Sequence, residues 1–290
     1  MQTRNPTVAG QFYPQKYGVC IGEIEECIHE KTLPTELPKP IVAGIVPHAG
    51  WVFSGSLAAM VFSAIKKQNE KVDCFIIFGA AHSYYKDMPA VYDKGAWNSP
   101  IGQVAVDEEL AEEVLKTKNA VSDPNAHKYE HSIEVQTPFI QHLFPFAKIL
   151  PILTPAETSA IDLGESIGNI IAASDKKIIC IGSTDLTHYG PRYGFEPAGE
   201  GTDAFKWSSQ VNDKEFIDCA LRLDGKELLA TARKNLNACG AGAAAATVEA
   251  VKKQNRNQGR LLAQTTSNEI MQKKMNTTSE DSVGYAAIVF

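Results

Sequence analysis

Three apolar segments of the chain each end in a histidine. In "IVAGIVPHAGW" and "CFIIFGAAHSYY" the apolar runs end at His48 and His82, and "IICIGSTDLTHYG" places Asp185 and His188 after a run of the same kind. Imidazole and carboxylate groups together suit Fe(II), Zn(II) or Cu. If the three segments meet, the sequence predicts a divalent metal site. The three-residue spacing of Asp185 and His188 puts both on one face if their turn is helical, so that one ligates and the other acts as acid or base.

Each of these residues has a simpler explanation when taken alone. A histidine near a strand end is usually a hydrogen-bonded structural residue, and Asp185 by itself would cap the turn after its strand. Three strands that deliver imidazoles to the same edge are harder to explain in this way. We therefore expect a functional site rather than three unrelated structural histidines.

Cys239 is a further candidate ligand. It opens the segment "CGAGAAAATVEAVKK", whose small residues predict a helix packed close to a sheet, with Gly240 and Gly242 allowing a close backbone approach. The positive end of a helix dipole lowers a thiol pKa and favours the thiolate, which is the metal-binding and nucleophilic form. A small buried residue beside Gly240 is the alternative, but next to a histidine cluster we favour the thiolate.

The remaining cysteines show no metal-binding or disulfide pattern. They are scattered without a CxxC pair, which in a reducing compartment argues against a disulfide framework and a zinc knuckle. Two of them lie inside apolar strand segments and are expected in the core. The five are Cys20, Cys27, Cys74, Cys180 and Cys219, of which Cys74 and Cys180 are the strand residues.

The segment "HKYEHSIEVQTPF" places two histidines and two glutamates, His127, Glu130, His131 and Glu134, within eight residues. Pro138 predicts that its first half is a loop and that a helix begins near this proline. We expect His127 and Glu134 to lie on the solvated surface. His131, which precedes an apolar run, is expected to turn inward and to support the metal ligands or donate a proton.

Short β-rich apolar runs alternate with longer segments of helical period. This pattern predicts an α/β fold, with a mainly parallel central sheet flanked by helices and with ligands bound at the carboxyl ends of the strands. We find no repeat or linker and expect a single domain over residues 1–290. The expected strands are 41–46, 74–79, 148–153, 178–183, 260–265 and 283–290.

The sequence also predicts where several helices begin. Apolar residues recur at helical spacing over 57–65, and Asp107 is expected to cap a helix. Thr154 is predicted to cap another, with Pro155 at its first position and Glu157 completing a capping box.

The bulk properties exclude several classes of function. A net charge of −6 argues against a nucleic-acid or anionic membrane surface. The start "MQTRNPTVAGQFYP" lacks the apolar core of a secretory signal, and no run reaches the roughly 20 apolar residues of a membrane span, so we expect a cytoplasmic protein. The sequence has no GxSxG elbow, GxxxxGK[ST] loop or GxGxxG turn, which leaves serine hydrolysis, P-loop binding and dinucleotide binding without support.

A set of motifs in order along the chain resembles the Memo family, the B-like component of the AmmeMemoRadiSam system. The motifs are "NPTVAGQFYP", "PHAGWVFSG", "GAAHSYY", "EHSIEVQTPF", "GSTDLTHYG" and "ACG". The resemblance implies a fold similar to the class III extradiol ring-cleaving dioxygenases, a redox function and bound iron or copper. Carried over by position, it implies pocket residues at His48, His82, Asp185, His188 and Cys239.

The resemblance to the dioxygenases is weaker at the metal. Those enzymes hold Fe(II) with two histidines and a carboxylate, which leaves positions open for a catecholate and O₂. Here Cys239 takes the place of the third ligand. A thiolate shifts the redox potential of the metal and leaves less room for two exogenous ligands. Ring cleavage therefore does not follow from the fold.

Three functions remain open on the sequence. The first is a metal-dependent oxidoreductase of unknown substrate, with His48, His82, Cys239 and Asp185 around iron or copper and with His188, His131 and Asp185 as catalytic groups. The second is a zinc-dependent hydrolase that uses the same pocket.

The third is a non-catalytic module that binds a peptide or small molecule. The long segments 84–101 and 189–208 are expected to be irregular and to supply an aromatic rim for it. The rim residues would be Tyr84, Tyr85, Trp97, Tyr189 and Tyr193, although we expect Trp97 to serve packing. A sequence of this kind is also expected to work beside enzymes encoded in the same operon.

Overall fold

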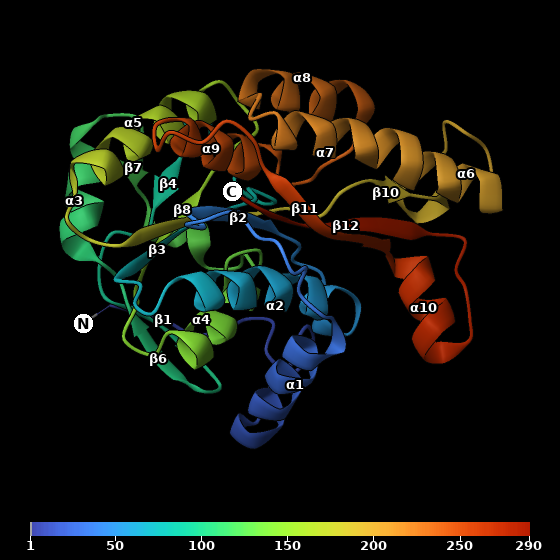
Figure 1. The fold of residues 1–290 in the computed structure, drawn as a ribbon, viewed down its shortest axis with the longest axis horizontal. Helices are drawn as coiled ribbons and strands as arrows, with labels where there is room; N and C mark the ends of the chain where they lie inside the picture. The colour runs from blue at the N-terminus through green and yellow to red at the C-terminus, as the bar shows by residue number, and fades with distance from the viewer. Residues whose placement is uncertain (1) are drawn as a thin grey trace.

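Four parallel strands form the centre of the main sheet (Figure 1). The computed structural model describes residues 2–290; residue 1, which the predicted domain includes, lies outside the described residues. The strands lie in the order β2 (Ala43–Val46), β9 (Ile178–Ser183), β3 (Cys74–Gly79) and β8 (Lys148–Leu153). They are almost wholly buried, because helices cover both faces of a parallel sheet.

Antiparallel strands extend this centre on both sides. Beside β2 lies β12 (Ser282–Val289), which also pairs with β11 (Arg260–Thr266) and β10 (His188–Tyr189). Beside β8 lies β4 (Ala90–Val91), which runs antiparallel to β8 and parallel to β7 (Val121–Ser122). The six predicted strands are all present, and the predicted α/β fold with a mainly parallel central sheet is confirmed.

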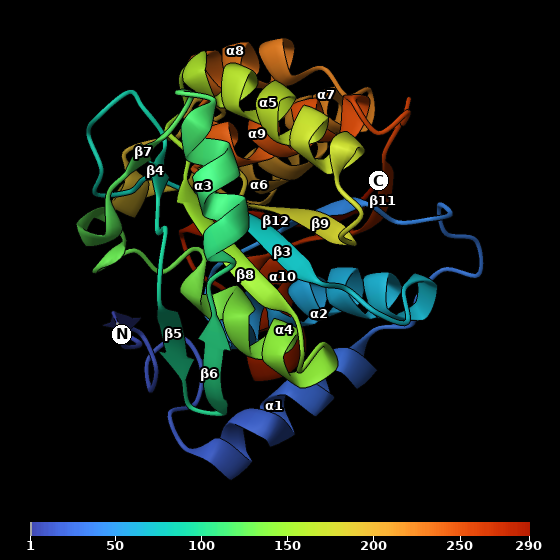
Figure 2. The same ribbon diagram turned by 90° about the vertical axis from the view of Figure 1, so that its left-hand side faces the viewer.

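Helices cover the two faces of the sheet in separate layers (Figures 1 and 2). The upper layer in both views consists of α3 (Glu108–Lys116), α5 (Ser159–Ala173), α6 (Thr202–Trp207), α7 (Asp213–Leu221), α8 (Gly225–Asn235) and α9 (Ala241–Lys252). The lower layer consists of α1 (Tyr17–Glu30), α2 (Trp51–Gln68), α4 (Thr137–Leu143) and α10 (Ser267–Met275).

The small residues of α9 allow it to pack very close to the sheet. A Cβ atom added at Gly182 of β9 would lie 2.5 Å from Oγ1 of Thr247 on α9. One added at Gly242, in the first turn of α9, would lie 2.1 Å from the carbonyl oxygen of Pro155. The close approach that the small-residue segment predicts is therefore confirmed.

One predicted helix start is correct and another is wrong. Asp107 caps α3, since its carboxylate accepts a hydrogen bond from the Leu110 amide at 3.3 Å. Thr154 does not cap α5, which begins five residues later at Ser159. The Thr154 amide instead donates to the Gly79 carbonyl at 3.0 Å, so the pairing of β8 with β3 continues past the predicted cap.

The two segments expected to be irregular contain regular structure. Residues 84–101 include β4 and β5 (Ala96–Ser99), and β5 joins β1 (Thr3–Arg4) and β6 (Gly102–Ala105) in a small second sheet. Residues 189–208 include the whole of α6. Between residues 2 and 290, no helix combines the length and the apolar character needed to cross a membrane.

Candidate metal site

Three histidines bring their ring nitrogens within 4.8 Å of one another. His48 follows β2, His82 follows β3, and His131 lies in the loop before a 3-10 turn at Glu134–Gln136. Because β9 lies between β2 and β3, the loops after these strands converge at the same edge of the sheet. The group could hold a metal ion, since neutral imidazole suits divalent transition metals.

The orientation of His48 is fixed by Ser183 at the end of β9. The Ser183 hydroxyl donates to the Ser132 carbonyl at 2.7 Å, and its oxygen faces Nδ1 of His48 at 3.1 Å. Because the hydroxyl proton is already used, Nδ1 of His48 is the donor of this second bond. The Nε2 lone pair of the buried His48 is then free to face the centre of the cluster.

The orientation of His82 is fixed by a carboxylate. Glu130 accepts from Nδ1 of His82 at 3.0 Å and from the His82 amide at 3.1 Å, and also from the Ser132 amide at 2.8 Å. A carboxylate behind a histidine holds the ring and raises its basicity in many metal sites. Burial lowers the pKa of His82, but hydrogen bonds to Cys239 and Glu130 outweigh it and raise the pKa to about 10. Burial likewise opposes ionisation of Glu130, yet His82 holds the pKa of that carboxyl well below its usual range.

Cys239 completes the cluster from the other side. Its Sγ atom lies 3.2 Å from Nε2 of His48 and 3.7 Å from the Asp185 carbonyl oxygen. Burial alone would raise the pKa of this thiol, but the imidazoles of His48 and His82 lower the pKa to about 7. The sequence predicts a helix that begins at Cys239, whereas α9 begins at Ala241 with Gly240 as its cap. The arrangement therefore offers one sulfur and several nitrogen donors, which fit a transition metal.

His131 differs from the other two histidines in how its ring lies. It stacks on His82 with an interplanar angle of 10° and a centroid distance of 4.8 Å, whereas the His48 ring is nearly perpendicular to both. His131 is turned inward, as the sequence predicts, and it offers one of the three ring nitrogens that lie within 4.8 Å of one another.

Asp185 and His188 lie beside the three histidines but face other partners. A carboxylate oxygen of Asp185 accepts from the His48 amide at 2.7 Å, and burial raises the pKa of this carboxyl. His188 begins β10, so the two residues do not share a helical face and that expectation is wrong. Nδ1 of His188 donates to the Leu186 carbonyl at 3.0 Å, and its ring packs edge-on against Tyr193.

The expectation that His127 and Glu134 are surface residues is wrong. Both are buried, with exposed fractions of 0% and 1%. Arg4 explains the burial of Glu134, because it donates to that carboxylate at 2.8 Å and to the main-chain carbonyl of His127 at 2.8 Å, with its guanidinium over the Trp97 ring at 4.2 Å. The His127 side chain is satisfied differently: its Nε2 atom bonds the Ala90 carbonyl at 3.0 Å, and burial lowers the pKa of its ring to about 3.

Glu134 also ties the N-terminal segment to the site. Its carboxylate accepts from the Thr7 and Val8 amides and from the Tyr13 hydroxyl at about 3.0 Å. The segment anchored in this way places Phe12 edge-on against His131, with ring centroids 4.9 Å apart. Sequence reasoning missed Phe12, although the "NPTVAGQFYP" motif that contains it was the available signal.

The predicted aromatic rim is only partly present. Trp97 is buried in β5, which confirms its packing role, and Tyr84 and Tyr189 are also buried. Tyr85 is 91% exposed and Tyr193 is 39% exposed, so these two remain available to a ligand.

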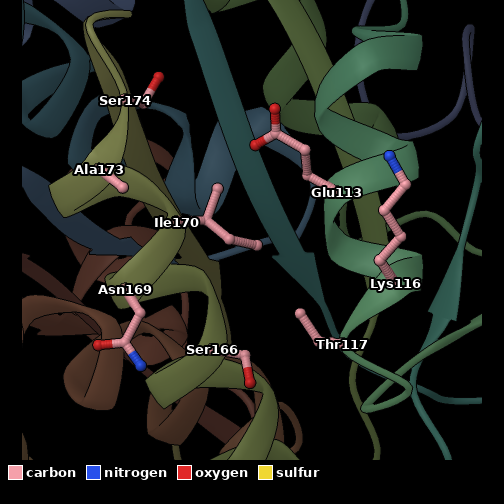
Figure 3. Close-up of a pocket in the computed structure, with 8 residues that line it drawn as sticks. All are labelled: Glu113, Lys116, Thr117, Ser166, Asn169, Ile170, Ala173 and Ser174. Atoms are coloured by element: carbon pink, nitrogen blue, oxygen red, sulfur yellow. The ribbon is translucent and has the colours of Figure 1, made fainter.

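A separate surface groove lies between α3 and α5, away from the histidines (Figure 3). Glu113 and Lys116 line one side of it, and Ser166, Asn169 and Ile170 line the other. The groove has neither an imidazole nor a thiol among its lining residues, unlike the histidine cluster.

Comparison with known proteins identifies the family of the chain. The model of the family described as "Memo-like protein" matches residues 4–289. Proteins named MEMO1 family protein from Methanococcoides burtonii, Thermococcus onnurineus and Pyrococcus abyssi are 34%, 35% and 35% identical to this chain over 290, 295 and 294 residues. The alignments cover 99% of this chain in each case and 99%, 99% and 98% of the relatives.

Proposed function

The chain belongs to the Memo-like protein family, and we propose that it is a metal-dependent oxidoreductase that holds iron or copper between His48, His82 and Cys239. The observation that carries the proposal is the 3.2 Å approach of the Cys239 sulfur to Nε2 of His48, on the face that the Ser183 contact leaves free. Glu130 leaves Nε2 of His82 free in the same way.

The donor set by itself also suits zinc, which would make the protein a hydrolase. Resemblance to a redox family with an extradiol dioxygenase-like fold favours iron or copper. Such a metal, when bound, supplies one-electron chemistry and reduction of O₂. The thiolate of Cys239 would shift the potential of the metal, which distinguishes this site from one built on two histidines and a carboxylate.

We propose that the residues around the metal position its ligands and transfer protons. Asp185 holds the His48 main chain, so we propose that it positions a ligand and is not one itself. His188 keeps Nε2 available while Nδ1 is bound to Leu186, and we propose it as the group that moves protons to or from the substrate. His131, stacked on His82 and partly exposed, is proposed as a second proton donor.

We propose that the substrate is a small molecule or a peptide end that enters beside Tyr85 and Tyr193, the two exposed residues of the aromatic rim. Enzymes encoded in the same operon are proposed as its source. A non-catalytic binding module that uses the same opening is the outcome to be distinguished from this proposal.

The test is metal content and oxygen consumption in matched histidine variants. His48→Ala and His82→Ala are compared with His29→Ala, whose side chain is 79% exposed on α1. We expect the first two variants to lose iron or copper while remaining folded by circular dichroism, and the third to retain it. Full metal retention in a His48→Ala/His82→Ala double variant would contradict the site. Stoichiometric zinc would favour the hydrolase, and a wild-type protein that refuses Fe(II), Cu and Zn would favour the binding module.

A further inference from the structure

A π-helical turn interrupts the helix that runs from α6 into α7. The turn spans Ser208–Asn212 and is followed directly by Asp213, the first residue of α7. Successive side chains on a regular α-helix are about 100° apart, and π-turns that change this phase are frequent at functional sites. Two consecutive polar residues at the end of this turn are buried, since Asn212 is 2% and Asp213 is 0% exposed.

Asn212 joins two segments that are distant in sequence. Its side-chain amide donates to Oγ1 of Thr187 at 3.0 Å and to the Asn235 carbonyl at 3.0 Å. The main-chain carbonyl of Asn212 accepts from the side-chain amide of Asn237 at 2.9 Å. Thr187 lies in the turn with Asp185 and His188, and Asn237 lies two residues before Cys239.

Asp213 fixes the first of these segments to the sheet. Its carboxylate accepts from the Thr187 amide at 2.9 Å. It also fills the space beside Gly284 of β12, where an added Cβ atom would lie 2.0 Å from the carboxylate. The Gly284 amide donates to the Thr187 carbonyl at 3.0 Å, so Thr187 is held from two sides.

The same two segments also meet at the candidate metal site. The Cys239 amide donates to the Asp185 carbonyl at 3.3 Å, and the Gly240 amide donates to Oγ1 of Thr184 at 2.9 Å. The segments are thus linked once at the site and once more by Asn212 behind it. Figure 1 shows α6 and α7 above β10, where this second link is made.

We infer that Asn212 is a positioning residue of the metal site, which holds Cys239 in place relative to Asp185 and His188. The inference rests on the proposed function, because the residue that is positioned is a proposed metal ligand. It assigns to the π-turn the task of presenting the Asn212 amide to both segments.

The test removes single hydrogen bonds with little change of shape. Asn212→Asp replaces the donating amide by an acceptor, and Thr187→Val removes the accepting hydroxyl. Asn69→Asp is the matched control, because Asn69 is 4% exposed and its amide donates to the Ile41 and Ile65 carbonyls at the far end of α2. Metal-free full-length protein is titrated with Co(II), and the thiolate-to-cobalt absorption reports coordination by Cys239.

We expect Asn212→Asp and Thr187→Val each to weaken Co(II) binding about tenfold and to reduce the thiolate absorption per bound ion. The double variant should bind Co(II) no more weakly than the weaker-binding single variant, because both substitutions remove the same hydrogen bond between Asn212 and Thr187. Asn69→Asp should stay within about twofold of the wild type. Wild-type affinity and absorption in both site variants would overturn the inference. If Asn212→Asp does not fold, Thr187→Val tests the inference instead, because this substitution buries no charge.

A second readout separates this inference from the proposed function. If the wild-type protein binds none of Co(II), Fe(II) and Cu, the proposed function fails, and amide hydrogen exchange in metal-free protein tests the Asn212 link alone. Asn212→Ala should then speed exchange at Thr187 and Cys239 together by at least about tenfold relative to Asn69→Ala. Unchanged exchange at both amides would contradict the positioning role.

Discussion

The sulfur of Cys239 lies 3.2 Å from Nε2 of His48, although 191 residues separate the two in the chain. His48 follows the parallel strand β2, and Cys239 precedes α9, which packs on the neighbouring strand β9. The sheet thereby brings a thiol and an imidazole into contact where loops diverge. This pair carries the proposal of a thiolate-ligated metal site.

The thiol of Cys239 is expected to react as a thiolate near neutral pH. Its pKa is lowered to about 7, so the rate of alkylation by iodoacetamide in metal-free protein should rise with pH and reach half its maximum near pH 7. The Cys239→Ser variant should lose this reaction, and Cys219→Ser, which removes a buried cysteine elsewhere, should keep it. A midpoint at about 8.5, the ordinary thiol value, would contradict the prediction.

Glu130→Gln should weaken metal binding about 10- to 100-fold, because Glu130 orients His82 from behind. Glu25→Gln is the control, since Glu25 also contacts histidines, His29 and His142, but has a side chain 46% exposed. Competition for Zn(II) with a chromophoric chelator measures both affinities. Equal affinities in the two variants would show that the carboxylate does not support the site.

The same substitution should change the pH dependence of stability in metal-free protein. The pKa of His82 is raised from 6.5 to about 10, so its contribution is complete below pH 6.5 and is lost as pH rises through 10. The pKa of Glu130 is lowered, so its contribution is present above pH 4.5 and is lost as pH falls through the folded value. The loss of unfolding free energy in Glu130→Gln, about 1–3 kcal/mol, should therefore be largest between pH 4.5 and 6.5 and should shrink towards pH 10. Urea unfolding at several pH values measures it, and a loss that grows towards pH 10 would contradict the assignment.

Arg4→Ala should destabilise the protein by about 3–5 kcal/mol, because it leaves the buried Glu134 carboxylate without its cation. Arg233→Ala removes an exposed partner of Glu157 and should cost less than about 1 kcal/mol. Urea unfolding measures both. Similar losses in the two variants would show that the Arg4 pair behaves as a surface pair.

Gly242→Ala should destabilise the protein by about 1–3 kcal/mol, because the new methyl group would meet the Pro155 carbonyl 2.1 Å away. Gly18→Ala on α1 has no atom within 4 Å of the new methyl and should be neutral or stabilising by up to about 1 kcal/mol. Thermal unfolding measures both changes. A neutral Gly242→Ala would mean that α9 can move away from the sheet at little cost.

The central sheet and the positions of His48 and His82 could be predicted because the sequence patterns that indicate them are local. Apolar runs mark β2, β3 and β9, and the rule that ligands bind at the carboxyl ends of parallel strands selects His48 and His82. The small residues after Cys239 likewise predict the close packing of α9.

The sequence predictions fail where a residue far away in the chain determines the environment of a side chain. Glu134 has the composition of a surface residue until Arg4, 130 positions earlier, is placed beside it. Thr154 satisfies the local pattern of a helix cap, yet its amide is used by Gly79 of a neighbouring strand. Phe12 reaches His131 only because Glu134 anchors the segment before it. No local pattern encodes such pairings.

The most direct test of a thiolate-ligated redox site is the metal content of wild-type protein and Cys239→Ser, purified anaerobically, without a His tag and without added metal. Mass spectrometry should find near-stoichiometric iron or copper in the wild type and a large loss of it in Cys239→Ser, while Cys219→Ser retains the wild-type content. Metal content that is unchanged in Cys239→Ser, or a wild-type protein that takes up neither Fe(II) nor Cu, would contradict the account.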